Sequence, residues 1–278
     1  MESHGFTVLL STYDRTDLCE IFVKAVDSCL NNTLQPNAIV IVIDGPVRSE
    51  FSVKIKKYEK HPLIEIVWLP KNVGLTRALN IGLQKVKTKY VFRADGDDVS
   101  RLNRFDLQMG ILNSGYDLVS GAIDEFDECG NYVATKFLPS SHEKIFRYCK
   151  RRNPFNHMAT AFELKSALDV GGYPDLYLTD NYSDWGLWIL MLEQGVRGFN
   201  SQEIFVDVSG GSRMYERRGG FKNILGEAGI QRFLVKHAKK SRLLAVFDFL
   251  ARVFLLTIPD KWKPFIFVNF MRTKNLRR

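Results

Sequence analysis

Short, predominantly apolar runs alternate with helical segments through the first hundred residues of this chain. The apolar runs, each the length of one strand, lie at residues 6–10, 39–43, 64–69 and 90–94. The segments between them are predicted to be helices, at 17–31, 49–60 and 75–86. Strands that are apolar on both faces are typical of a parallel sheet covered by helices on each side. The sequence therefore predicts an α/β fold, with a Rossmann-like, mostly parallel sheet flanked by helices.

The pattern changes after residue 100. The predicted elements are a hairpin with arms at 117–128 and 132–138, and helices at 142–152, 185–194 and 221–257. A glycine-rich stretch at 210–220 is the softest boundary along the chain. We therefore expect a catalytic domain over residues 1–220 and a helical, basic C-terminal extension over residues 221–278.

Positive charge is concentrated in the last quarter of the chain. The chain has 39 Lys and Arg against 31 Asp and Glu, for a net charge of +8. Residues 210–278 hold 16 basic and 4 acidic residues, or +12, which leaves 23 and 27, or −4, for residues 1–209. Such a basic segment predicts a polyanionic partner: nucleic acid, anionic lipid or the phosphates of a substrate.

The apolar stretch at 243–258 lies inside this basic region and is interrupted by Asp248 and Arg252. It is shorter than the roughly 20 apolar residues that span a bilayer. Trp262 and several lysines and arginines follow it, and aromatic residues among cations are typical of an interfacial anchor. We expect peripheral association with a membrane rather than binding to nucleic acid; the alternative is a helix packed on the catalytic core.

Polar side chains follow three of the predicted strands at the point where each one ends. Residues 12–15, Asp44 and residues 95–98 occupy these places, where open α/β sheets bind their ligands. Asp95, Asp97 and Asp98 stand so close together that they repel each other unless a cation or solvent relieves them. They predict a site for Mn²⁺ or Mg²⁺, the alternative being a solvated acidic turn.

An ordered set of motifs resembles the family 2 glycosyltransferases of GT-A fold, closest to bacterial members that build capsule, exopolysaccharide and O-antigen repeats. The matching stretches are VLLSTYDR at 8–15, IVIVIDGP at 39–46, KNVGLTRALNIGL at 71–83, YVFRADGDDVSRLNRFDLQ at 90–108, NPFNHMATAF at 153–162, VGGYPD at 170–175 and YSDWGLWILMLEQG at 182–195. The resemblance covers residues 5–235. It implies a metal-dependent, inverting transfer of a sugar, such as a hexose, from a nucleotide-sugar to an acceptor hydroxyl.

The predicted donor site combines the resemblance with the position of basic residues along the chain. Its residues are Thr12, Tyr13, Arg15, Asp44, Arg77, Arg93, Asp95, Arg217 and Arg218. The resemblance places the first four around the nucleotide base. The arginines are expected to meet phosphates, with an ion pair to the aspartates as the alternative for Arg93. Arg217 and Arg218 are expected in a basic loop that closes over the diphosphate. The alternative is that their charges face a membrane.

Asp184 is the predicted catalytic base. An acceptor hydroxyl is a poor nucleophile, so a carboxylate within hydrogen-bond reach must take its proton. The resemblance aligns Asp184 with the family's base, although Ser183 stands where a Glu is usual, and Asp180 is the second candidate. The alternative role for Asp184 is to cap the following helix. His157 and Trp185 are the residues expected to contact the acceptor. For His157 the alternatives are contact with the diphosphate and a structural role.

The expected partners are a nucleotide-sugar, a lipid-linked saccharide acceptor and the inner leaflet of the inner membrane. The lipid-linked acceptor follows from the resemblance and the tail. Four cysteines without C-x-x-C spacing are typical of a reduced compartment, so a cytoplasmic, membrane-peripheral location is expected. Two alternatives stay open: a nucleotidyltransferase, and a non-catalytic nucleotide-, nucleic-acid- or membrane-binding protein. Neither G-x-G-x-x-G nor G-x-x-x-x-G-K-[ST] follows the first strand, which disfavours dinucleotide and P-loop chemistry.

Overall fold

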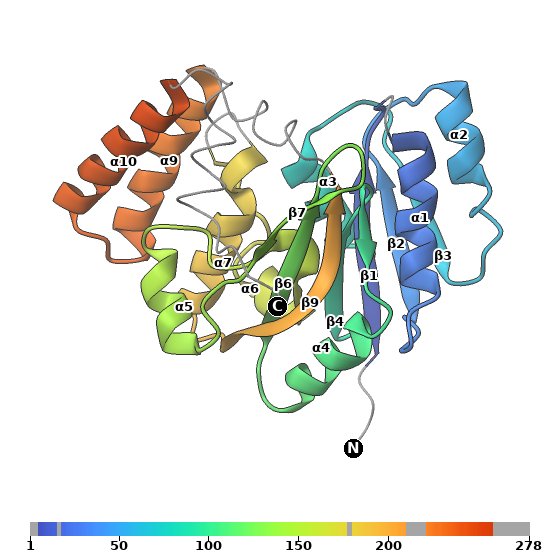
Figure 1. Ribbon diagram of the computed structural model, residues 1–278, viewed down its shortest axis with the longest axis horizontal. Coiled ribbons are helices and arrows are strands. Elements are labelled where there is room, and N and C mark those ends of the chain that lie inside the picture. Colours follow the sequence, from blue (N-terminus) through green and yellow to red (C-terminus); the bar gives the residue numbers. More distant parts are fainter. Residues whose placement is uncertain (1–4, 16–17, 177–179, 210–220, 258–278) are drawn as a thin grey trace.

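A computed structural model shows one mixed β-sheet with helices packed on both faces (Figure 1). It describes residues 5–15, 18–176, 180–209 and 221–257. Within these ranges the strand order is β3-β2-β1-β4-β8-β6-β9-β5, and β7 pairs with β6. The predicted α/β architecture and the hairpin after residue 100 are both confirmed.

The first half of the sheet is parallel, and its strands are largely buried except for the edge strand β3. Its strands are β1 (Phe6–Thr12), β2 (Ala38–Ile43), β3 (Ile64–Trp68) and β4 (Tyr90–Asp95). Val8 and Leu10 of β1 point to one face of the sheet, and Leu9 points to the other. Because neighbouring side chains alternate between faces, a strand that is apolar at every position contributes to two cores at once.

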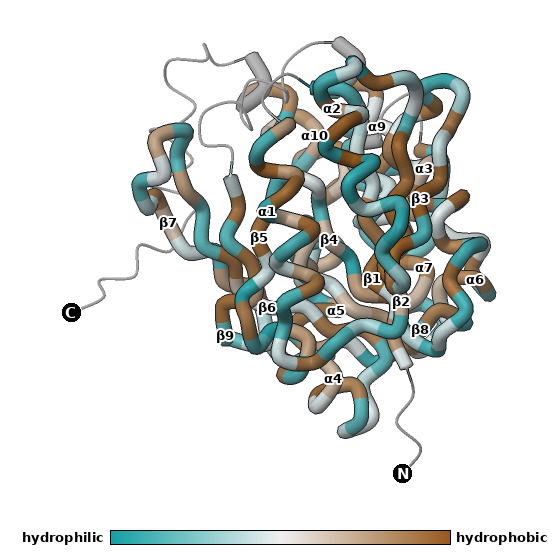
Figure 2. Tube along the Cα trace, turned by 90° about the vertical axis from the view of Figure 1, so that its right-hand side faces the viewer, coloured by the Kyte–Doolittle hydropathy of each residue, from teal (hydrophilic) through white to brown (hydrophobic). Residues whose placement is uncertain are grey.

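Helices cover each face of this sheet. The first core lies against α1 (Leu18–Leu30), α2 (Ser49–Lys56) and α4 (Arg104–Asn113). The second lies against α3 (Leu75–Leu83), α5 (His142–Cys149), α6 (Leu164–Asp169) and α7 (Ser183–Glu193). Figure 2 shows short hydrophobic and hydrophilic stretches alternating along the tube of α1, as expected for a helix in which each turn has one buried side. Most helices end earlier than their sequence pattern predicts, and α7 begins two residues sooner.

The second half of the sheet mixes directions. Its strands are β5 (Asp98–Ser100), β6 (Leu118–Phe126), β7 (Tyr132–Lys136), β8 (Ala161–Glu163) and β9 (Gly198–Ser209). Strands β6 and β9 are parallel, whereas β8 runs antiparallel to both β4 and β6. Strand β5 pairs with β9 directly after the acidic turn, and this pairing fixes the end of that turn in the sheet. Two short 3-10 helices, η1 (His157–Ala159) and η2 (Asp180–Tyr182), complete the elements around the strand ends.

Two C-terminal helices pack on the second core. Helix α9 (Phe221–His237) contacts α7, and α10 (Arg242–Thr257) packs against α9. Ile230 and Leu234 of α9 are fully buried in the same core as Trp188 of α7. Within the described ranges, none of the helices is both long and apolar enough to cross a bilayer.

Candidate active site

The parallel strands bring their carboxyl ends to one edge of the sheet. Ser11 of β1 pairs with Asp95 of β4, and Thr12 pairs with Ile43, which precedes Asp44. The polar residues expected at three strand ends therefore lie side by side. Thr12 is 4% exposed, and its Oγ1 has no hydrogen-bond partner among the protein atoms described.

Three carboxylates cluster at this edge. One oxygen each from Asp95, Asp97 and Asp98 lies within 4.8 Å of the others. Asp98 is 6% exposed, and burial together with the charges of Asp97 and Asp95 raises its pKa well above the usual value. Hard divalent cations take several carboxylate oxygens at close spacing, so this donor set suits Mg²⁺ or Mn²⁺. Arg15 contacts the same cluster, because its Nη1 donates to Asp97 Oδ2 at 2.9 Å.

Arg93 lies on the interior side of this cluster, away from solvent. Its side chain is fully buried, pairs with Asp95 and donates from Nη1 to the Leu9 carbonyl at 2.6 Å. The expected direct contact with donor phosphates does not agree with this position, whereas the alternative, an ion pair with an aspartate, does. A buried guanidinium needs such partners, and here they orient the Asp95 carboxylate.

His157 continues the same network toward a pocket. Arg93 Nε donates to His157 Nε2 at 3.1 Å, and the Tyr173 hydroxyl lies 3.0 Å from that nitrogen. Burial and the neighbouring Arg93 lower the pKa of His157 to about 3, so the ring is neutral at physiological pH. The position agrees with an acceptor contact, since His157 lines the pocket, but a proton-donating role does not fit a neutral ring held in this way.

Asp44 organises the start of α3. Its Oδ1 accepts from the Val73 amide at 2.7 Å and its Oδ2 from the Gly74 amide at 3.0 Å. The turn that follows depends on Gly45, whose φ is +97° and whose added Cβ would lie 2.6 Å from the Asn72 nitrogen. Both carboxylate oxygens therefore already bind the protein backbone, a role that the sequence pattern did not predict. Each oxygen still has a second lone pair for a ligand N–H.

The remaining predicted donor residues lie at or near the surface. Tyr13 is 41% exposed and stacks with Arg15, whose guanidinium carbon is 5.9 Å from the ring centroid. Arg77 points outward to form an exposed ion pair of 3.0 Å with Asp175. Arg217 and Arg218 fall outside the residues that the structure describes.

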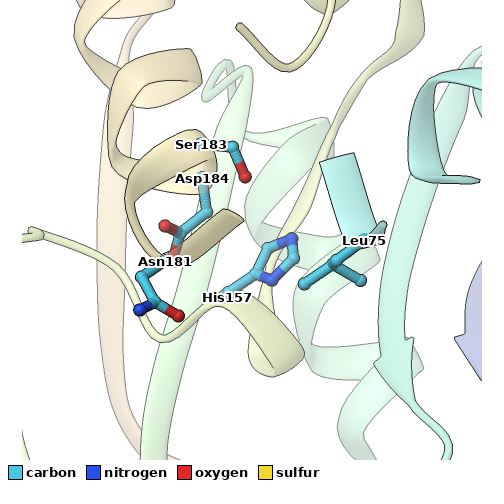
Figure 3. Close-up of a pocket in the computed structure, with 5 residues that line it drawn as sticks. All are labelled: Leu75, His157, Asn181, Ser183 and Asp184. Atoms are coloured by element: carbon cyan, nitrogen blue, oxygen red, sulfur yellow. The ribbon is translucent and has the colours of Figure 1, made fainter. Parts of the chain in front are cut away.

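A pocket of about 210 Å³ brings Asp184 and His157 together (Figure 3). It is lined by Leu75, His157, Asn181, Ser183 and Asp184. Asp184 Oδ2 accepts from Asn153 Nδ2 at 2.6 Å, and its Oδ1 accepts from the Trp185 amide at 2.7 Å. Burial raises the pKa of Asp184 above its usual value, although these two hydrogen bonds act in the opposite direction. The side chain of Asp180, the second candidate, lies outside the described side chains.

Trp185 faces away from this pocket. It is 2% exposed, its indole Nε1 donates to the Cys149 carbonyl at 2.9 Å, and Arg252 lies over its ring. The expected contact with an acceptor does not agree with this burial. Trp185 instead holds α7 against α5 and α10, directly beside Asp184.

Several residues at the site were not singled out from the sequence, among them Leu75 and Asn181 of the pocket, Tyr173 beside His157, Asn153 and Arg104. Asn153 binds Asp184, and Arg104 is fully buried and donates to Ser100, Gln108 and the Arg93 carbonyl. Both lie inside the quoted motifs at 153–162 and 90–108, which was the only signal available. Arg104 connects α4 to the strand that carries Asp95, and so it supports the acidic cluster from below.

Comparisons with known proteins agree with this arrangement. Residues 7–172 match the family model for glycosyl transferase family 2. The chain is 32% identical over 270 residues to an Escherichia coli UDP-Gal:alpha-D-GlcNAc-diphosphoundecaprenol beta-1,3-galactosyltransferase, with 96% of each chain covered. It is 30% identical to the amylovoran biosynthesis glycosyltransferase AmsE of Erwinia amylovora, over 94% of this chain and 97% of that one.

Solved structures share the fold at lower identity. S. aureus TarS in complex with UDP-GlcNAc has a TM-score of 0.61 and 14% identity, over 94% of this chain and 78% of that chain. A mannosyltransferase from Pyrobaculum calidifontis in complex with GDP-Man and Mn²⁺ has a TM-score of 0.57 and 15% identity, over 94% and 72%. The likeness extends beyond residue 172, into the helices that follow the matched family region. By its sequence motifs, its relatives and its fold, this chain belongs to the family 2 glycosyltransferases.

Proposed function

We propose that this glycosyltransferase inverts the anomeric centre of a hexose as it moves the sugar from a nucleotide diphosphate to a hydroxyl of a lipid-linked glycan. The observation that carries the proposal is that one edge of the sheet holds two distinct groups, a carboxylate cluster and a single carboxylate in a pocket. A carboxylate cluster suited to a metal lies at the end of β4. A single, oriented carboxylate, Asp184, lines the neighbouring pocket.

Asp95, Asp97 and Asp98 would hold Mn²⁺ or Mg²⁺ on the donor side. Their carboxylates converge closely enough to share one ion, and Arg93 and Arg15 hold two of them in place. A bound divalent ion stabilises negative charge on a departing diphosphate. The protein's own contribution is to keep these carboxylates oriented, which costs no reorganisation during the reaction.

Asp184 would take the proton of the acceptor hydroxyl. Its carboxylate is held by Asn153 and the Trp185 amide, so its orientation is set before the acceptor arrives. The raised pKa makes it a stronger base than a surface aspartate. One such carboxylate is sufficient for a single-step displacement, since the nucleoside diphosphate leaves without help from a second carboxylic acid.

The nature of the acceptor is proposed from the relatives. The E. coli relative is named for a diphosphoundecaprenol-linked GlcNAc acceptor and a UDP-Gal donor, and the Erwinia relative for amylovoran biosynthesis. High coverage of both chains supports a similar pair of substrates here. A lipid-linked acceptor also suits a cytoplasmic, membrane-peripheral enzyme in which residues 1–220 form the catalytic domain and residues 221–278 a membrane-associating extension.

The test is transfer of sugar from a panel of UDP- and GDP-sugars to a synthetic lipid diphosphate carrying GlcNAc, in the presence of Mn²⁺. The expected result is a disaccharide lipid from one donor, with the inverted anomeric configuration by NMR. Asp184→Asn should lower the rate of product formation by about 10²–10⁴-fold while still binding the nucleotide. Asp106→Asn, an exposed change on α4, is the matched control and should retain full activity. Retained configuration, or wild-type turnover in Asp184→Asn, would contradict the proposal.

A further inference from the structure

Helix α10 exposes a row of apolar side chains on one side. Leu243 is 85% exposed, Val246 57%, Phe247 64% and Leu250 60%. These four residues, the outer face of α10, recur at the spacing that places side chains on the same side of a helix. Figure 1 shows α10 at the edge of the molecule, beside α9 and on the far side of it from the sheet.

The opposite side of α10 is held to the protein by charged groups. Asp248 pairs with Arg151 at 2.6 Å and with Lys240 at 2.8 Å, and Arg252 pairs with Glu227 at 3.2 Å. The Lys240 side chain is completely buried. Rotating α10 to hide its outer face would leave the buried charges of Lys240, Asp248 and Glu227 without these partners. The apolar row is therefore fixed outward by the fold.

The exposed charged residues at the start of the outer face are positive. Lys239 and Arg242, at the start of α10, are exposed. Asp248 is the only acidic residue in the sequence of α10, and its charge is directed inward. Residues 258–278, next in the chain, contain six lysines and arginines and one aspartate. An apolar strip with exposed cations at its start matches the headgroup region of an anionic bilayer, where apolar side chains enter and cations meet the lipid charge.

We propose that the outer face of α10 is the surface on which the protein docks to an anionic lipid bilayer, with Leu243, Val246, Phe247 and Leu250 entering the boundary between headgroups and acyl chains. Docking through this face would hold α7 one helix away from the lipid. Arg252 connects α10 to α7, because its guanidinium carbon lies 5.3 Å from the ring centroid of Trp185, the neighbour of Asp184. Binding to vesicles can be measured without any sugar, so this proposal succeeds or fails independently of the proposed reaction.

The test is flotation of the full-length protein with vesicles of phosphatidylcholine alone or with phosphatidylglycerol added. Wild type should bind the anionic vesicles and bind less as salt is raised. Phe247→Ser with Leu250→Ser removes two apolar side chains that are already exposed, so the fold is retained, and the partition coefficient should fall about tenfold or more. Val53→Ser with Leu102→Ser, at 68% and 64% exposure on other elements, is the matched control and should bind like wild type.

A Trp at position 250 reports what contacts the face. In Leu250→Trp, the indole should be quenched by iodide without vesicles, and its emission should shift to the blue when anionic vesicles are added. Three outcomes would overturn the proposal. One is equal binding by the two double variants. The second is an indole already shielded from iodide without lipid, which would mean that residues 258–278 cover the face. The third is a dimer that Phe247→Ser with Leu250→Ser converts to a monomer, which would make the face a self-association surface.

Discussion

Asp184 Oδ2 accepts a hydrogen bond of 2.6 Å from Asn153 Nδ2, across 31 residues of chain. The amide donates from the loop that precedes η1, and the Trp185 backbone N–H holds the second carboxylate oxygen. A carboxylate held by two donors keeps one orientation toward the pocket that it lines with His157. Asn153 therefore orients the carboxylate, whereas Asp184 itself is proposed to take the proton of the acceptor hydroxyl.

Asp184→Asn should lower kcat by about 10²–10⁴-fold, the usual contribution of a general base. Nucleotide binding should be unchanged, because the acidic cluster remains intact. Since burial raises the pKa of Asp184, the folded state binds more protons than the unfolded one as pH rises past the ordinary aspartate range. Ionised Asp184 therefore costs stability at neutral pH, and its removal should leave Tm equal or higher. Single-turnover kinetics and calorimetry measure the two effects, and a lower Tm with normal kcat would contradict both.

Asn153→Ala should shift the acidic limb of the kcat profile to higher pH. The Asn153 hydrogen bond stabilises the ionised carboxylate, so its loss raises the pKa of Asp184 further. Lys136, which lowers that pKa, and Asp95, which raises it, stay in place and set the background. A purely structural role for Asn153 would lower kcat equally at every pH. Asn113→Ala, at the exposed end of α4, is the control and should leave the profile unchanged.

Asp97→Asn should raise the Mn²⁺ concentration needed for half-maximal activity by about tenfold or more, because one carboxylate ligand is lost. Without metal the same change relieves repulsion on Asp98, whose pKa is raised partly by the charge of Asp97. In EDTA, the Tm of the variant should therefore be equal to or higher than that of wild type. The increase in Tm on adding Mn²⁺ should be smaller in the variant. Asp14→Asn, from an exposed pair with Arg48, should change neither value. An unchanged metal requirement would remove Asp97 from the site.

Asp248→Asn should destabilise the protein by about 3 kcal/mol, because it leaves the buried Lys240 ammonium without its charged partner. Burial alone would raise the pKa of Asp248, but the hydrogen bonds and the positive charges of Arg151 and Lys240 together lower it. Its contribution to stability is therefore present above the unfolded-state pKa of about 3.9 and is lost as pH falls through the lower folded-state value. Urea unfolding at pH 7 and pH 3 should show the difference between variant and wild type shrinking at the lower pH. Asp169→Asn, from an exposed pair with Lys165, should change stability little at either pH.

The fold and much of the site were predictable from local pattern. Apolar runs of strand length that alternate with helical segments determine a covered, mostly parallel sheet, because only such a sheet buries both faces of every strand. That topology in turn brings the strand ends together, so Thr12, Asp44 and Asp95 could be placed at one edge without coordinates. The acidic turn was predictable as a cation site because three carboxylates within four residues repel each other unless a cation or solvent compensates their charge.

Tertiary structure alone decided which charges face inward. Arg93 and Arg104 are charged yet fully buried, because partners from distant segments satisfy their donors. Trp185 likewise turns from the pocket to the Cys149 carbonyl and Arg252.

The same distinction applies to α10. Its sequence determined an apolar helix interrupted by Asp248 and Arg252, but not the direction in which either charge points. Arg151, 97 residues away, sets the direction of Asp248 and so turns the apolar side outward. A helical period shows which residues share a side, whereas the side that is buried depends on partners that only the folded chain brings near.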